Sequence, residues 1–255
     1  MFEVYSKMIE YNLENYDFKK AMQQNIKDNF KPLLLSNSFT KTGNSKYIRE
    51  KAGLVQLITF RIEKDRLKAF ASFFPLCFPV DYILTYGIEI TGSNGFKLLN
   101  GKYFTTIYEP EYFDKAIQLK NYYSKHQINM QKLFLSIKEG VLPEMDRIDS
   151  LDKFIKLFDQ SVPVFFGYEF ENAYRKTAYH KYIISTYSCL KKNFPKGIDE
   201  LKQLKDQILE KELIECIELL LEPENGEWDI SYDKFCENYE TLCDMRRKKL
   251  KITKR

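Results

Sequence analysis

The sequence has few of the residues that mark specialised classes of protein. Only 10 glycines and 8 prolines occur among 255 residues, which is too few for a fibrous or linker-rich chain. No run of about 18 apolar residues is present, so the sequence predicts no membrane span. The first twenty residues mix acids with apolar side chains, unlike a secretory signal. We therefore expect a globular protein that does not bind a membrane.

Cysteine and histidine are also scarce, and their spacing carries no motif. The five cysteines form no C-x-x-C pair, and their odd number is typical of reduced thiols in a cytoplasmic protein: Cys77, Cys189, Cys216, Cys236 and Cys243. The only two histidines, His126 and His180, lack the spacing of a zinc site. The sequence therefore predicts no catalytic residue, no cofactor and no metal ion.

What the sequence has in abundance is charge, and its two signs are separated. The net charge is only +4, yet residues 199–244 hold fifteen acids against four lysines. Residues 246–255 carry seven positive charges and no acid. This tail predicts either a frayed, solvated C-terminus or an arm for an acidic partner or a nucleic acid. The tail contains no aromatic side chain that could stack on a base.

Hydrophobic periodicity predicts an α+β fold. A helix is expected over residues 17–35, with Asp17 as its N-cap and a kink or restart at Pro32. Turn residues separate the expected strands, which cover residues 47–50, 54–62, 68–78, 84–90 and 103–108. Helical spacing then returns over residues 111–138, 150–159, 164–193, 198–221 and 231–250.

The order of these segments predicts two domains. Short links between strands require antiparallel neighbours, so an N-terminal helix should pack on a meandering antiparallel sheet of about five strands. A helical C-terminal half should follow. We expect an α+β sheet domain at residues 1–108 and a helical domain at residues 109–255, packed against the first.

Three patterns in the sequence are similar to catalytic or phosphate-binding motifs, but each favours a structural role. Gly95 and Gly101-Lys102 lack the spacing of a phosphate-binding loop and predict a hairpin turn. Asp81 and Glu89 are separated as in a metal-dependent nuclease, but Thr91 stands where that site needs a lysine. Glu169 and Glu171 lie early in an expected helix, where acids stabilise the helix dipole. A nuclease or hydrolase stays the third alternative.

Basic residues in the expected strands and in the tail form the candidate binding surface. They could contact an acidic partner, or they could be a solvated sheet face on which lysines prevent edge pairing. The residues predicted to bind a partner are Lys46, Arg49, Arg61, Arg66, Lys68, Arg246, Arg247, Lys248 and Lys249.

Part of the chain resembles a bacterial domain family of unknown function. The matching residues are Lys31-Pro32-Leu33-Leu34, Phe39-Thr40-Lys41, Arg49 and Gln56–Phe60. Ser38 departs from the family pattern, which has glycine before the phenylalanine. The resemblance covers roughly residues 17–108. It implies an α+β fold and a bacterial or phage protein, and it implies no activity.

These observations favour a non-enzymatic protein that binds another macromolecule. A protein partner is expected, as for an immunity or defence-associated factor of a bacterium or phage, because complementary charge selects partners. The alternative is a nucleic-acid-binding protein that uses the basic tail and the Lys- and Arg-rich strands.

Overall fold

A computed structural model shows a mixed fold of antiparallel sheet and helices. It describes residues 17–63, 66–79, 84–91, 95–100, 103–106, 127–156, 173–191, 193–224 and 229–252. The predicted α+β class is confirmed at this level. In this described part of the chain no helix is long and apolar enough to cross a bilayer.

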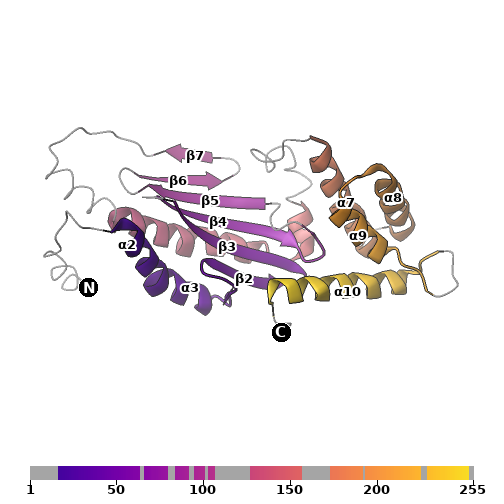
Figure 1. The fold of residues 1–255 in the computed structure, drawn as a ribbon, viewed down its shortest axis with the longest axis horizontal. Helices are drawn as coiled ribbons and strands as arrows, with labels where there is room; N and C mark the ends of the chain where they lie inside the picture. The colour runs from indigo at the N-terminus through magenta and orange to yellow at the C-terminus, as the bar shows by residue number, and fades with distance from the viewer. Residues whose placement is uncertain are drawn as a thin grey trace, which may run out of the picture. The chain divides into compact units, whose positions relative to one another are not determined.

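The sheet follows the order of the chain. Each strand lies beside the next, from β1 to β7, as Figure 1 shows for β2 to β7. The strands are β1 Thr40–Lys41, β2 Lys46–Lys51, β3 Leu54–Glu63, β4 Arg66–Pro75, β5 Leu84–Thr91, β6 Gly95–Asn100 and β7 Tyr103–Thr106. The connection between β2 and β3 is Ala52-Gly53, and both residues have positive φ, 47° and 76°. Two successive residues with positive φ are typical of a type I′ turn. The twist of this turn matches the twist of the two strands that it joins.

The predicted count of about five strands is not confirmed, because the residues that the structure describes form a sheet of seven. The sequence missed β6, whose first residue is Gly95 and whose length is six residues. Strand β6 pairs antiparallel with both neighbours: Thr91 is registered opposite Gly95, and Asn100 opposite Tyr103. The turn predicted at Gly101-Lys102 lies outside the described residues.

The N-terminal helical segment begins where the sequence predicts. The Asp17 side chain accepts a hydrogen bond from the Lys20 backbone N–H at 3.0 Å and caps α2, Phe18–Asn25. The segment then widens into a π-helical stretch, η2 Ile26–Phe30, before α3, Lys31–Ser36. Pro32 lies in the first turn of α3. Proline has no N–H and its ring clashes with the carbonyl four residues earlier, so the restart predicted at Pro32 has a steric cause.

The same arrangement, a π-helical stretch followed by a proline near the start of the next helix, recurs further along the chain. Residues 127–135 are α-helical and are followed by a π-helical stretch, η3 Ser136–Val141, and then by α5, Leu142–Arg147. Pro143 stands two residues after η3, as Pro32 stands two residues after η2. A wider turn just before the proline keeps each helical path continuous.

Helix α3 ends in a left-handed residue. Ser38 has φ 65°. Its N–H donates to the Leu35 carbonyl at 3.1 Å, and the Phe39 N–H donates to the Leu34 carbonyl at 3.0 Å. These two bonds form the helix-ending motif that normally carries glycine at this position. The glycine of the resembled pattern therefore has a backbone reason, and Ser38 adopts the same conformation at a cost.

We expect Ser38→Gly to raise the free energy of unfolding by about 1 kcal/mol, because glycine has no Cβ to strain at positive φ. Ser36→Gly is the matched control. It places glycine at the last residue of α3 and should lower the free energy of unfolding by about 0.5 kcal/mol. Urea denaturation of both variants checks the opposite signs. Equal effects would contradict the left-handed strain at residue 38.

The chain divides into two compact units, and neither is a continuous stretch of sequence. Unit 1 contains residues 1–47, 58–71 and 86–144, and unit 2 contains residues 48–57, 72–85 and 145–255. The boundary predicted between residues 108 and 109 stays a prediction.

The core of unit 1 joins the N-terminal helices to the sheet. Met22, Ile26, Phe30 and Leu34 recur every four residues along α2, η2 and α3, and all are buried. The Phe30 ring lies 5.0 Å from the ring of Phe60 in β3, measured between centroids. Aromatic pairs at this distance add specific contacts to the burial of apolar area.

Unit 2 contains the long helices α7 Ala173–Lys191, α8 Phe194–Gln207, α9 Lys211–Leu220 and α10 Tyr232–Leu250. The Tyr182 hydroxyl of α7 donates to the Cys77 carbonyl at 3.0 Å, and the Phe78 ring lies 5.3 Å from that of Tyr179. These contacts fix α7 against the chain segment that follows β4.

The single helix predicted over residues 198–221 is wrong, because the chain breaks between α8 and α9. Ile208 is extended, with φ −107° and ψ 156°. Buried apolar residues recur up to Ile208, but the next one is Leu213, five residues later. A helix would need an apolar residue at position 211 or 212, and these are Lys211 and Glu212. The change of phase therefore ends α8 without proline or glycine.

Candidate interaction surface

The residues predicted to bind a partner divide into exposed and buried sets. Lys46, Arg61, Lys248 and Lys249 are exposed, and Lys68 is half-buried. Arg66 begins β4, and its side chain lies outside the described residues. Arg49, Arg246 and Arg247 are each less than one-tenth exposed. Partners inside unit 2 hold these three side chains, and their role in binding a partner stays a prediction.

Arg49 belongs to a buried polar network. Its Nε donates to Gln56 Oε1 at 2.6 Å, and its Nη2 lies 2.7 Å from Asp146 Oδ1. Lys51 Nζ contacts the same carboxylate oxygen at 2.7 Å. Burial lowers the pKa of Arg49, whereas the Asp146 charge works against that shift. Burial raises the pKa of Asp146, but Lys51 and Arg49 outweigh it, and the pKa lies below its ordinary value.

Arg247 joins α10 to strand β2. Its Nε and Nη2 donate to the two carboxylate oxygens of Glu50 at 2.9 and 2.8 Å, a bidentate pair. Asp244 and Glu240 contact its remaining nitrogen, Nη1. The hydrogen bonds that Arg247 donates to Glu50 are the main reason why the pKa of Arg247 is raised. Arg246 lies over the Phe74 ring, 5.8 Å from its centroid.

The C-terminal basic segment is therefore structural over most of its length. The expectation of a frayed C-terminus is wrong for residues 246–250, which form the end of α10. This helix carries acids in its first part and Arg247, Lys248 and Lys249 in its last turn. Negative charge near the N-terminus and positive charge near the C-terminus both stabilise a helix dipole. Part of the charge separation in the sequence thus follows from one helix.

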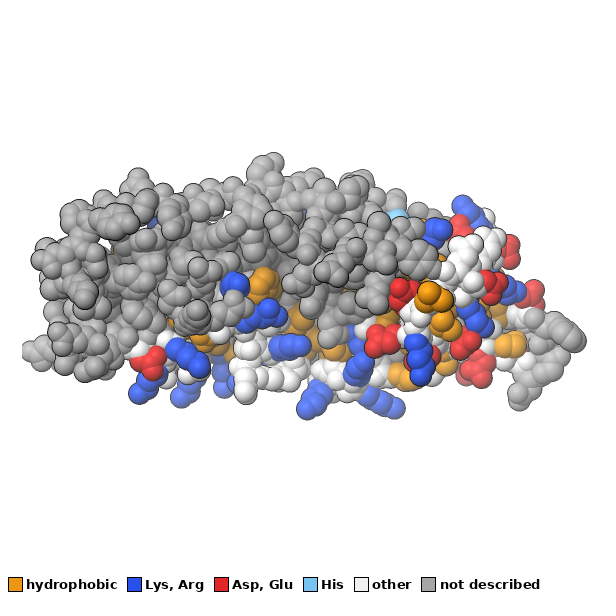
Figure 2. Space-filling model, turned by 45° about the horizontal axis from the view of Figure 1, so that its top comes forward, with side chains coloured by type: hydrophobic (Ala, Val, Ile, Leu, Met, Phe, Trp, Pro, Cys, Tyr) orange, Lys and Arg blue, Asp and Glu red, His pale blue; other side chains and the backbone are white. Residues whose placement is uncertain are grey.

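A second, larger charged feature is explained only in part by internal pairs, of Glu240 with Arg247 and of Glu237 with Lys234. We define the acidic helical surface as six exposed carboxylates of unit 2: Asp206, Glu212, Glu215, Glu218, Glu237 and Glu240. They come from α8, α9 and α10. Figure 2 shows acidic side chains gathered over this helical part of the molecule, with Lys and Arg side chains between them.

Lysines pair with only part of this surface. Lys205 Nζ lies 3.0 Å from Glu218 Oε1, and Lys211 Nζ lies 3.6 Å from Glu215 Oε1. Both pairs are solvent-exposed, and such pairs contribute at most about 1 kcal/mol each to stability. The acids exceed the lysines around α9, and the excess negative charge faces the solvent.

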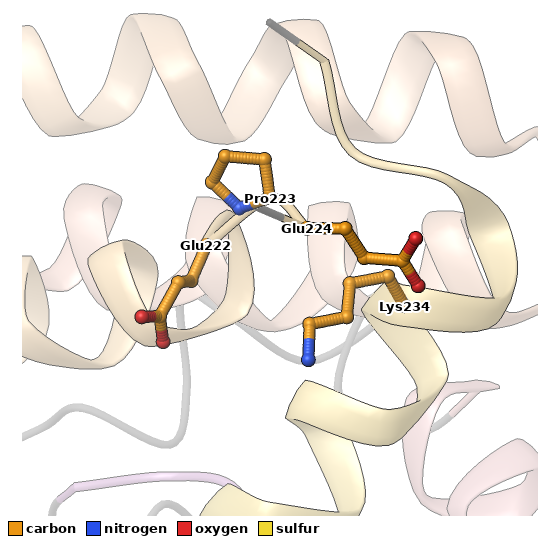
Figure 3. A pocket seen from close by; sticks show the side chains of 4 residues that line it. All are labelled: Glu222, Pro223, Glu224 and Lys234. Atoms are coloured by element: carbon orange, nitrogen blue, oxygen red, sulfur yellow. The ribbon is translucent and has the colours of Figure 1, made fainter. Parts of the chain in front are cut away.

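A shallow depression of about 470 Å³ lies beside this surface and is lined by Glu222, Pro223, Glu224 and Lys234. Figure 3 shows the Glu222 and Glu224 side chains pointing away from each other on either side of Pro223. Lys234 Nζ contacts Glu237 at 3.0 Å. Two diverging carboxylates cannot share a proton or chelate an ion. The depression therefore adds negative charge to the surface and offers no catalytic pair.

The residues weighed for enzymatic chemistry are not brought together in the described chain. Asp81, Glu169, Glu171 and His126 lie outside the described residues. Glu89 in β5 is registered opposite Lys97. Across the described residues, no group of three or more His, Cys, Asp or Glu side chains could hold a metal ion.

The two other candidates for a nucleophile and base are far apart. His180 and Cys189 lie on one continuous helix, α7, where nine residues correspond to about 13.5 Å along the axis. All five cysteines are free thiols in unit 2. Burial raises the pKa of Cys189 and of Cys243 to about 12, and that of Cys216 to about 11. Such thiols stay protonated at neutral pH and are poor nucleophiles.

Comparisons of the chain with protein-family models, with curated proteins and with solved structures found no match. The resemblance over residues 17–108 stays a prediction.

Proposed function

We propose that this chain is a non-enzymatic protein-binding module and that the acidic helical surface of unit 2 binds a protein rich in Lys and Arg. One observation supports this proposal. Exposed carboxylates on α8, α9 and α10 exceed the lysines that pair with them, whereas the buried Arg49 and Arg247 are held by carboxylates within unit 2.

Folding does not require such a surface. Exposed acids on neighbouring helices repel one another, and this repulsion slightly lowers stability. A partner of opposite charge would turn the repulsion into attraction and would raise the association rate. Complementary charge is therefore the simplest use for the excess of acids.

Fewer basic residues are accessible for binding a nucleic acid than the sequence predicts. Arg246 and Arg247 are buried, so they cannot reach a phosphate. Lys248, Lys249 and Lys251 remain exposed at the end of α10. The acids of the same unit would repel a phosphate backbone. A role in immunity or defence, and a cytoplasmic location, stay predictions.

We expect neutralisation of α9 to weaken partner binding about tenfold at low salt. The variant is Glu212→Gln, Glu215→Gln and Glu218→Gln combined, and the loss corresponds to about 1.4 kcal/mol shared among three exposed charges. The full chain is first used to capture its partner protein from a lysate of the native host, and this partner is then purified. Its affinity is then measured by calorimetry from 50 to 500 mM salt.

The matched control neutralises three exposed bases, Lys46, Lys248 and Lys249, by substitution with glutamine. It should leave affinity within twofold or strengthen it. Weaker binding after loss of the bases, with no change after loss of the acids, would overturn the acidic surface and would favour the basic residues predicted from the sequence.

A further inference from the structure

One apolar side chain stands out within the acidic helical surface. Leu209 is 88 % exposed, whereas the other exposed large hydrophobic residues of the described chain range from 39 to 56 %. It lies in the three-residue connection between α8 and α9. Water surrounds almost the whole side chain, so Leu209 contributes nearly nothing to the core of unit 2.

The backbone on both sides of Leu209 is fixed. Ile208 is only 5 % exposed and anchors the connection in the core. The Glu210 carbonyl accepts hydrogen bonds from the N–H groups of Leu213 and Ile214, both at 3.0 Å, and begins α9. The Leu209 N–H donates to the Glu210 carboxylate at 3.3 Å. A backbone held in position before binding loses less entropy when the partner binds.

The neighbours of Leu209 decide which class of partner could cover it. Asp206 and Glu212 are exposed on either side of the connection, and Glu210 is half-exposed. An anionic membrane would repel these acids, since peripheral insertion combines apolar side chains with basic ones. A nucleic acid would be repelled for the same reason. A second copy docked symmetrically through this connection would place like charges together.

We infer that Leu209 is the apolar anchor of this interface and that it enters an apolar pocket rimmed by Lys and Arg side chains on the partner protein. This inference rests on the proposed function and adds the point of attachment. Interfaces commonly combine a buried apolar anchor with a charged rim. Here the anchor would be Leu209 and the rim would be the acids of α8 and α9.

The test uses the full chain with a photo-crosslinking amino acid at position 209 or, as control, at position 245. Met245 is 56 % exposed on α10, outside the connection. After irradiation in a lysate of the native host, the protein crosslinked from position 209 is identified and purified. Its affinity is then measured for the wild type, Leu209→Ser and Met245→Ser.

We expect Leu209→Ser to weaken binding ten- to a hundredfold, as for the loss of one buried leucine, and Met245→Ser to change it less than twofold. The melting temperature should be the same for all three proteins. If Leu209→Ser binds within twofold of the wild type while neutralisation of α9 still weakens binding, the anchor is wrong and the proposed function stands. If neither change weakens binding, both are wrong. Equal crosslinking from both positions, or none from position 209, also overturns the anchor.

Discussion

Gln56→Ala should lower the free energy of unfolding by about 4 kcal/mol. Gln56 is fully buried in β3. Its Nε2 donates to the carbonyls of Met145 at 2.6 Å and Ile148 at 2.8 Å, and its Oε1 accepts from Arg49. Alanine would leave two carbonyls and one guanidinium N–H without these bonds. Each buried group left unsatisfied costs about 1–3 kcal/mol.

The network explains why a polar residue occupies the centre of this strand. Gln56 supplies one acceptor and two donors at the place where β2, β3 and the chain around Met145 meet, all within unit 2. Gln203→Ala on the exposed face of α8 is the matched control and should change stability by less than about 0.5 kcal/mol. An equally small effect of Gln56→Ala in urea denaturation would show that the carbonyls find other donors.

Gly197→Ala should lower the free energy of unfolding by about 3 kcal/mol, although alanine is the better helix former. Gly197 lies in α8 where it crosses α7. A Cβ added there would stand 2.8 Å from the Cys189 nitrogen and 2.9 Å from the Ser185 carbonyl oxygen. Both atoms belong to the backbone of α7, so a change of side-chain rotamer cannot relieve the contact. The two helices would have to move apart.

Gly140 supplies the control for Gly197. It is exposed in η3, and a Cβ added to it meets no atom within 4 Å. Gly140→Ala should therefore raise the free energy of unfolding by up to about 1 kcal/mol through lower backbone entropy in the unfolded chain. Opposite signs for the two glycines, measured by thermal and urea denaturation, would confirm that close helix packing determines residue 197. The same sign at both positions would contradict it.

Local signals in the sequence predicted local structure well. The cap Asp17 was recognisable because an aspartate side chain before a helix can accept a hydrogen bond from a backbone N–H three residues later, as it does here from Lys20. Helix α10 follows from its cap and its apolar spacing. Strand β6 was missed because Gly95 and Asn100 at its ends resemble turn residues. The break after α8 was missed because a change of apolar phase is a weaker signal than proline.

The buried arginines could not be predicted in the same way. Arg247 pairs with Glu50, 197 residues away, and Arg49 pairs with Asp146, 97 residues away. A single sequence gives no means of matching such distant charges. The one local hint was the acid pair Glu240 and Asp244, which lie on the same side of α10 as Arg247. The excess of acids on the surface was visible in the sequence. The exposure of Leu209 was not, because it depends on where α8 ends.

The pairing of Glu50 with Arg247 also constrains the order in which the protein can be completed during synthesis. Residues 48–57 and 72–85 leave the ribosome early, yet their partners in unit 2 include Arg246 and Arg247 near the end of α10. All segments of unit 1 have been translated by residue 144, whereas unit 2 needs nearly the whole chain. The strand residues of unit 2 therefore lack these partners until α10 has been synthesised. In a nascent chain stalled before α10 they would stay uncovered, where chaperones could bind them or aggregation could begin.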